Sequence, residues 1–167
     1  MPTTQLRFVV LHSTHTSLFT LLLVMVASCI TPAWASAFLA GRPEFGSWFD
    51  WVNGWWAERL AHPESVLWLH YEDMQKQPLV EIKRVAAFLN IPSVDEALIS
   101  SVALKASFDN MKTQADQKGG AHHMRKGVSG DWQTHFSEPL TSQFMTAYSE
   151  RCRDSIASGL RYDFGSM

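Results

Sequence analysis

The stretch Ser65-Val-Leu-Trp-Leu-His70 is a short, almost continuous apolar run that follows a turn signal at His62-Pro63. Runs of this kind are typical of a strand that is buried on both faces in a parallel sheet. Segments with helical patterns lie before and after it. The order of these segments therefore predicts an α/β fold, in which short parallel strands are packed by helices.

A helix is predicted upstream of this strand. Ser47 is placed to cap its N-terminus, and His62-Pro63 ends it. Apolar residues recur near the 3.6-residue period, so that one face of the helix is expected to be buried. That face comprises Trp48, Trp51, Val52, Trp55 and Leu60.

Two further helices are predicted directly downstream. Pro78 suits the first turn of a helix that runs to about Leu89. The apolar stripe of this helix is Leu79, Ile82, Val85, Ala86 and Leu89. The pattern Ser93-x-x-Glu96 is typical of a capping box and predicts a second helix. Its inward positions are Leu98, Ile99 and Val102.

The C-terminal third alternates between helix and loop. A short helical turn is expected from Ala106-Ser107-Phe108 to Met111. Residues 113–130 hold four of the nine glycines and little hydrophobic period, which predicts a long loop. A last amphipathic helix is predicted over about 139–157. It is expected to bury Leu140, Phe144, Tyr148 and Ile156.

Composition excludes several classes of protein. Of the 167 residues 46% are hydrophobic and 18% are charged, as in globular domains. The formal net charge of −2 argues against a general nucleic-acid binder, which usually carries a basic excess. Cys29 and Cys152 make no disulfide framework and have no metal-site spacing.

A metal site is also disfavoured. His122 and His123 are adjacent, and His135 follows twelve residues later. Neighbouring side chains diverge in most backbones, and no Cys or carboxylate completes a closed ligand set. We therefore expect no metal.

The first 37 residues differ from the rest and are taken as a separate unit, with the main domain over 38–167. Leu18 to Ile30 is an apolar run followed by small residues, as in a secretory signal peptide cleaved after Ala35 or Ala37. The run is too short for a membrane span, which needs about 20 apolar residues. A buried helix and a translated non-coding segment are the alternatives.

The loop Arg125-Lys126-Gly127 has the chemistry of a phosphate site. Arg presents a planar fork to two phosphate oxygens, Lys adds a mobile charge, and Gly lets backbone N–H groups approach closely. By themselves these three residues would equally suit an ordinary basic surface loop.

The surrounding sequence changes this balance. Four blocks, in order, resemble the C-terminal half of the cytosolic-type sulfotransferase family, a family with a P-loop-like α/β fold. They are Phe45-Gly-Ser-Trp-Phe49 with Trp55-Trp56, Tyr71-Glu-Asp-Met74 with its following helix, Ser107-Phe108-x-x-Met111-Lys112, and Arg125-Lys-Gly-x-x-Gly-Asp-Trp132.

The resemblance implies the donor 3′-phosphoadenosine 5′-phosphosulfate (PAPS) and a set of residues that bind it. Arg125, Lys126, Gly127 and Ser107 would hold the 3′-phosphate, Ser107 at the N-terminus of a short helix. Tyr71 would lie near the adenine, which Phe108, Met124 and His123 would also border. The implied reaction is transfer of a sulfuryl group to a hydroxyl or amine of a small-molecule acceptor.

The sequence also departs from the family pattern. Residues 1–37 contain neither Gly nor Lys, so the family's phosphosulfate loop is not found there, and no catalytic His is assigned. The N-terminal half of the fold is therefore expected to be missing, and an inactive chain that binds adenosine 3′,5′-bisphosphate or a full-length partner is the alternative. The usual dimer segment is not preserved at 133–142. The family implies a cytoplasmic location, and the N-terminus implies secretion as the alternative.

Overall fold

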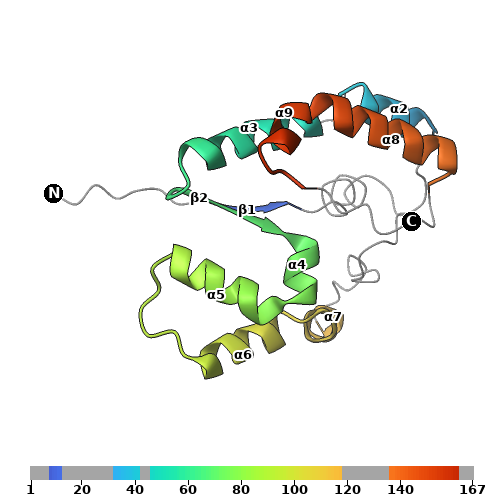
Figure 1. Ribbon diagram of the computed structural model, residues 1–167. Coiled ribbons are helices and arrows are strands. Elements are labelled where there is room, and N and C mark those ends of the chain that lie inside the picture. Colours follow the sequence, from blue (N-terminus) through green and yellow to red (C-terminus); the bar gives the residue numbers. More distant parts are fainter. Residues whose placement is uncertain (1–7, 13–31, 42–45, 118–135, 162–167) are drawn as a thin grey trace.

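The centre of the fold is a pair of parallel strands (Figure 1). The computed structural model describes residues 8–12, 32–41, 46–117 and 136–161. Strand β1 (Phe8–His12) pairs with β2 (Val66–His70) in a register that joins Phe8 to Val66 and His12 to His70. The predicted strand is confirmed to within one residue. β1 was not anticipated, because it lies in the segment that sequence reasoning had set apart as signal-like.

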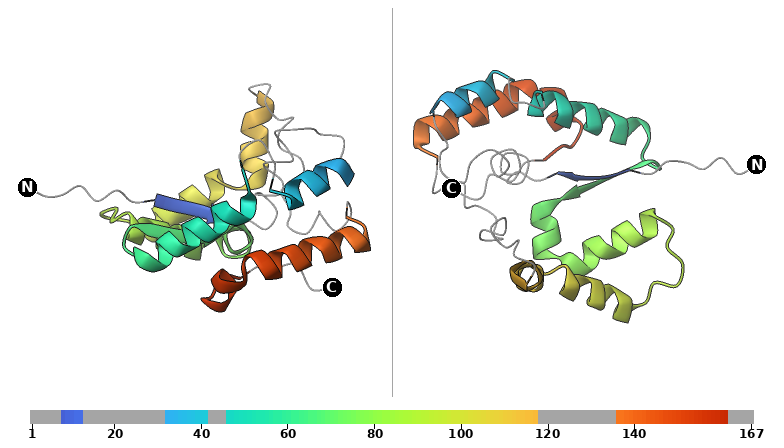
Figure 2. Two further views of the ribbon diagram at one scale, coloured as in Figure 1. Left: turned by 90° about the horizontal axis from the view of Figure 1, so that it is seen from above. Right: turned by 180° about the vertical axis from the view of Figure 1, so that it is seen from behind.

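Helices lie on both sides of these strands (Figures 1 and 2). On one side are α2 (Pro32–Leu39), α3 (Trp48–Ala61), α8 (Glu138–Arg151) and α9 (Arg153–Ala157). On the other are α4 (Tyr71–Lys76), α5 (Pro78–Phe88), α6 (Glu96–Lys105) and α7 (Phe108–Gln117). The predicted α/β arrangement is therefore confirmed. Among the described residues, no helix is long and apolar enough to cross a membrane.

The core between α2, α3, α8 and β2 is largely aromatic. The Phe38 and Phe144 rings lie 5.4 Å apart and join α2 to α8. The Trp56 and Trp68 rings meet edge to face at 5.2 Å and join α3 to the sheet. Such pairs add to the stabilisation from burial alone. The buried cluster comprises Ala35, Phe38, Trp48, Phe49, Val52, Trp56, Val66, Trp68, Phe144, Tyr148, Cys152 and Leu160.

Helix α3 begins where the sequence predicts. The Ser47 side chain accepts a hydrogen bond from the Asp50 N–H, and the chain leaves the helix at His62. The predicted buried face is only partly right. Trp51 and Leu60 are 43% and 49% exposed, whereas Trp56, outside the predicted stripe, is buried. The buried row runs along Trp48, Val52 and Trp56 at four-residue steps, which turns Trp51 toward solvent.

The α5–α6 pair is covered less than predicted. Ala86 and Ile99 are buried as expected, and Ile82 and Val85 are half-buried. The remaining inward positions of the prediction are more than a third exposed, namely Leu79, Leu89, Leu98 and Val102.

The capping box at Ser93 is wrong. Ser93 has φ 58°, in the left-handed region, so it lies in the turn and does not form an extended cap. Asp95 has the extended backbone of a cap, and its carboxylate accepts a 2.7 Å hydrogen bond from the Leu98 N–H.

The last two predictions need adjustment. Helix α7 continues to Gln117, so residues 113–117 are helical and not part of the predicted loop. The predicted helix over 139–157 is interrupted at Cys152 and forms α8 and α9. Phe144 and Tyr148 are buried and Leu140 is half-buried as predicted, but Ile156 is 36% exposed.

Candidate functional site

The candidate site lies at the carboxyl end of β2. In open parallel α/β sheets, ligands bind outside the carboxyl ends of the strands. β2 ends at His70, which pairs in register with His12 at the end of β1, and α4 begins at the very next residue, Tyr71. The absence of any loop between strand and helix fixes Tyr71 at this edge.

Tyr71 presents a half-buried aromatic ring. Gln75, one helical turn later, donates a 2.7 Å hydrogen bond from Nε2 to the Tyr71 hydroxyl. Burial, together with the Glu72 carboxylate, raises the pKa of Tyr71 despite that hydrogen bond. The phenol is therefore neutral near pH 7, and its ring is a flat surface on which a base could stack.

Ser107 and Phe108 form the start of α7. The Ser107 hydroxyl oxygen accepts a long, 3.4 Å hydrogen bond from the Asn110 N–H, and its carbonyl accepts from Met111 at 2.9 Å. In the bond with Asn110 the Ser107 hydroxyl acts only as an acceptor. Its own proton can therefore be donated to an anion. Backbone N–H groups of a first helical turn favour anions as well. Phe108 is half-buried beside it.

The fold brings these predicted residues to one side of the sheet. In both Figure 1 and Figure 2, α7 lies beside α4, to which α5 and α6 connect it. Tyr71, Ser107 and Phe108 are thus on neighbouring elements. The other predicted site residues, His123, Met124, Arg125, Lys126 and Gly127, lie outside the described residues.

Sequence reasoning missed a charged cluster around Tyr71. Arg161, which follows α9, forms an ion pair with Asp73 on α4. His70 is half-buried at the strand end. Burial, followed by the nearby Arg161 guanidinium, lowers the pKa of His70. Asp73 belongs to the Tyr71–Met74 motif and so carried a signal. Arg161 lies in no recognised motif, and only the fold brings it to Asp73.

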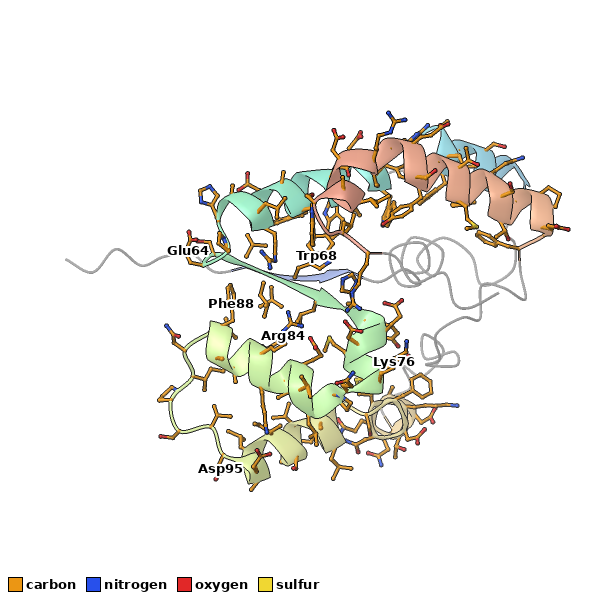
Figure 3. The ribbon with its side chains drawn as sticks, viewed as in Figure 1. Glu64, Trp68, Lys76, Arg84, Phe88 and Asp95 are labelled. Carbon is orange, nitrogen blue, oxygen red and sulfur yellow. The ribbon has the colours of Figure 1, made fainter. Side chains whose placement is uncertain are left out.

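An ion pair with one buried member joins α5 to the sheet. Glu81 is 5% exposed and pairs with Arg84, which also donates to the Trp68 carbonyl of β2 at 3.3 Å. Figure 3 shows Arg84 reaching from α5 toward the strand that carries Trp68. This contact fixes the helix that follows α4 against β2, and so helps to hold α4 at the carboxyl edge.

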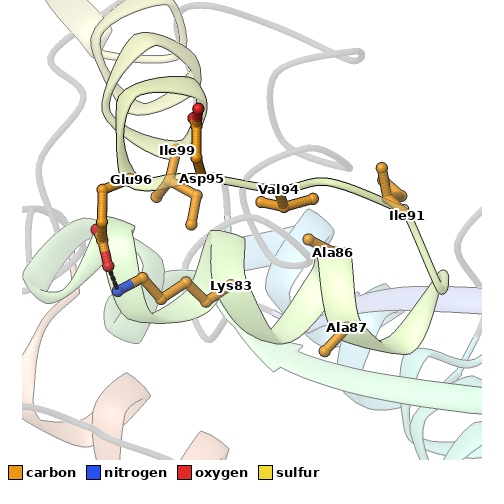
Figure 4. Close-up of a pocket in the computed structure, with 8 residues that line it drawn as sticks. All are labelled: Lys83, Ala86, Ala87, Ile91, Val94, Asp95, Glu96 and Ile99. Atoms are coloured by element: carbon orange, nitrogen blue, oxygen red, sulfur yellow. Dashed lines mark hydrogen bonds and ion pairs between the residues drawn. The ribbon is translucent and has the colours of Figure 1, made fainter.

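A groove between α5 and α6 is separate from this site (Figure 4). It has a volume of about 680 Å³ and lies near the start of α6, whereas α7 follows the other end of that helix. Lys83 and Glu96 pair with each other across it, and Asp95 caps α6. Its charged groups therefore already have partners within the fold. Among the described residues, no group of three or more His, Cys, Asp or Glu side chains could hold a metal ion.

Parallel strands with helices on both sides define an α/β protein, a class in which ligands bind beyond the carboxyl ends of the strands. A family model of the sulfotransferase domain matches residues 11–155. The chain belongs to the sulfotransferase family, as its sequence motifs predict.

Individual relatives agree. Mouse sulfotransferase 1B1 is 36% identical over 125 residues, which cover 68% of this chain and 41% of the relative. Mouse sulfotransferase 2B1 is 35% identical over 126 residues, which cover 68% and 36%. The chain thus spans about two-fifths of the length of the curated relatives it matches.

Solved structures agree as well. The crystal structure of mouse sulfotransferase SULT7A1 complexed with PAP superposes with a TM-score of 0.77 at 26% identity, over 92% of this chain and 60% of that one. A retinol dehydratase superposes with a TM-score of 0.75 at 23% identity, which is a likeness of fold. The family match begins at residue 11, upstream of the boundary predicted at residue 38, and that boundary stays a prediction.

Proposed function

We propose that this chain binds the 3′-phosphoadenosine part of PAPS at the carboxyl edge of its sheet. The sulfotransferase-domain match over residues 11–155 carries this proposal. A relative of the same fold has been crystallised with PAP, the product that PAPS leaves after transfer. Tyr71, Ser107 and Phe108 have the chemistry that such a nucleotide needs: an aromatic surface for the base, and a hydroxyl at a helix start for a phosphate.

The remaining contacts are assigned by motif. Arg125, Lys126 and Gly127 hold the 3′-phosphate together with Ser107, and Met124 and His123 border the adenine. The reaction of the complete site moves a sulfuryl group from PAPS to a hydroxyl or amine of a small-molecule acceptor. The acceptor oxygen or nitrogen bonds to sulfur, the bond from sulfur to the donor's phosphate oxygen breaks, and the acceptor loses a proton. We place the activity in the cytoplasm, with secretion as the alternative.

Binding without turnover is the second candidate function. The first Lys of the sequence is Lys76 and the first Gly is Gly41, so residues 1–65 contain no Lys-bearing glycine loop. A lysine on the leaving phosphate would stabilise the charge that develops there in transfer. On this observation the chain by itself binds the nucleotide, and turnover requires that loop from elsewhere.

Calorimetric titration of the whole chain with adenosine 3′,5′-bisphosphate tests the proposal. The whole chain is needed because β1, at residues 8–12, pairs with β2. Saturable binding is expected, and adenosine 5′-monophosphate, which lacks the 3′-phosphate, should bind at least about tenfold more weakly, since charge-assisted hydrogen bonds to a phosphate are strong.

Two double variants locate the site. Arg125→Ala/Lys126→Ala should abolish the preference for the 3′-phosphate. Arg59→Ala/Arg153→Ala removes the same charge from α3 and α9, on the other side of the sheet, and should retain it. No binding by the folded chain would refute the proposal, and so would an equal loss in both double variants.

A further inference from the structure

The Tyr71 hydroxyl has a hydrogen-bond donor held directly beside it. Gln75 follows one helical turn later on α4, and its Nε2 donates a 2.7 Å hydrogen bond to the hydroxyl oxygen. Side chains four positions apart share one face of a helix, and each leans toward the helix N-terminus. The Gln75 amide is therefore directed toward the carboxyl edge of β2, where α4 begins.

This bond determines where the hydroxyl proton can point. A tyrosine hydroxyl carries one proton to donate and also accepts hydrogen bonds at its oxygen. The Gln75 N–H uses the oxygen as an acceptor. In the part of the chain that the structure describes, the Tyr71 hydroxyl makes no second hydrogen bond. Its proton is thus directed away from Gln75 and remains for a bound molecule.

The same bond makes the hydroxyl a stronger donor. Linked hydrogen bonds polarise one another, so an oxygen that accepts one bond gives its own proton more readily. Burial, followed by the Glu72 carboxylate, raises the pKa of Tyr71, whereas the bond from Gln75 acts to lower that pKa. Burial therefore keeps the phenol protonated, and Gln75 keeps the O–H bond polarised.

We infer that Gln75 is a positioning residue that directs the Tyr71 proton toward a hydrogen-bond acceptor on the nucleoside of PAPS. This inference rests on the proposed function for the identity of the nucleoside. The hydroxyl lies at the rim of the ring, so a nucleoside that rests against the ring meets a proton donor there. Gln75 acts through Tyr71 and directly follows the Tyr71–Met74 motif, but it was not among the site residues predicted from the sequence.

NMR spectra of the whole chain with ¹³C-labelled tyrosine test the contact in the absence of nucleotide. The Cζ signal of Tyr71, assigned with Tyr71→Phe, should shift in Gln75→Met, which keeps the side-chain length and loses the N–H donor. It should not shift in Gln143→Met, which changes an exposed glutamine of α8 on the other side of the sheet. An unmoved Tyr71 signal in Gln75→Met would overturn the inference, as would an equal shift in Gln143→Met.

Calorimetric titration with adenosine 3′,5′-bisphosphate tests the direction of the proton. Gln75→Glu supplies a carboxylate that accepts the Tyr71 proton, so this substitution should weaken binding by at least about tenfold. The same substitution in a Tyr71→Phe background measures the effect of the added charge alone. There the loss should be at least about threefold smaller, since residues in contact are energetically coupled. Equal losses in the two backgrounds would overturn the inference.

The outcomes separate this inference from the proposed function. If the unmodified chain does not bind the nucleotide, the proposed function fails, and this inference fails with it. If the chain binds and the two backgrounds give equal losses, only the present inference fails. The same comparison with adenosine 5′-monophosphate should show the same coupling, because the hydrogen-bond acceptor belongs to the nucleoside. Coupling that disappears with the 3′-phosphate would place the acceptor on that phosphate and overturn the assignment.

Discussion

The Ser155 hydroxyl donates a 2.7 Å hydrogen bond to Oδ1 of Asn53, across 102 residues of sequence. Nδ2 of the same Asn53 donates to the Arg151 carbonyl at 2.8 Å, and the nearby Trp56 indole donates to the Ser158 hydroxyl at 3.0 Å. Together these bonds fasten α3 to the end of α8 and to α9. The Asn53 side chain on α3 thus links the helices that cover one side of the sheet.

Asn53→Ala should therefore reduce the free energy of unfolding by about 1–3 kcal/mol, because it leaves the 8%-exposed Ser155 hydroxyl and the Arg151 carbonyl without these partners. Urea denaturation followed by circular dichroism measures the change. Ser149→Ala, which removes an exposed hydroxyl bonded to the Thr146 carbonyl, should change it by no more than about 0.5 kcal/mol. Equal effects of the two variants would show that the Asn53 contacts do not stabilise the layer.

Two aromatic residues of α3 lie on opposite faces of the helix, Phe49 on the buried face and Trp51 on the exposed one. Phe49 is 2% exposed, and its ring contacts those of Phe38 and Trp48. Phe49→Ala should cost roughly 3–5 kcal/mol of unfolding free energy, since it leaves a cavity in the core. Trp51→Ala should cost about 1 kcal/mol or less, because 43% of Trp51 is already exposed. The same urea denaturation measures both variants. If Trp51→Ala lowered the free energy of unfolding as much as Phe49→Ala, Trp51 would belong to the buried face, as the sequence pattern predicted.

The comparison of Trp51 with Trp56 shows what periodicity can and cannot predict. The existence of α3 follows from local signals, because the Ser47 cap and the His62-Pro63 stop act within a few residues. Which of several aromatic residues is buried depends on where α8 and α9 pack, and that is tertiary information. Ser93 and Asp95 give a similar lesson, since both are good cap residues and only the turn geometry decides between them.

The candidate site divides in the same way. Tyr71, Ser107 and Phe108 could be recognised because each belongs to a contiguous motif. Arg161 could not, because its partner Asp73 is 88 residues away and single charged residues near a chain end carry no pattern. β1 was missed for a related reason: a lone five-residue apolar stretch within residues 1–37 has no strand signal of its own until β2 pairs with it.

The thiol of Cys152 should be inert in the folded chain. It is fully buried, and burial raises its pKa to about 11 even though Arg151 acts in the opposite direction. At pH 8 only about one thiol in a thousand is then ionised, and the thiolate is the reactive form. In a Cys29→Ser variant, a disulfide reagent such as dithionitrobenzoate should label Cys152 slowly in buffer and completely in concentrated urea. Rapid labelling in buffer would contradict the packing of α8 on the core.

The stability of the chain should fall as the pH drops below about 6.5. Burial and Arg161 lower the pKa of His70 in the folded state, with Arg84 acting in the same direction and Asp73 and Glu72 opposing. In this window the unfolded chain binds a proton that folded His70 resists, so acid favours unfolding. His70→Gln should flatten the dependence of unfolding free energy on pH between 7 and 5.5. An unchanged pH dependence in His70→Gln would exclude His70 as its source.

Ser107→Asp separates helix capping from phosphate binding. Aspartate is as good an N-cap as serine, so the Asn110 N–H keeps an acceptor and the thermal midpoint of unfolding should change by less than about 2 °C. The added carboxylate, however, removes the hydroxyl donor and places a negative charge where the proposed 3′-phosphate binds. Affinity for adenosine 3′,5′-bisphosphate should therefore fall at least about tenfold, by analogy with the cost of like charges in contact. Ser107→Ala should show the complementary result, a lower thermal midpoint from the lost cap with a smaller loss of affinity. If Ser107→Asp binds the nucleotide as well as the unmodified chain, Ser107 is a helix cap and the 3′-phosphate lies elsewhere.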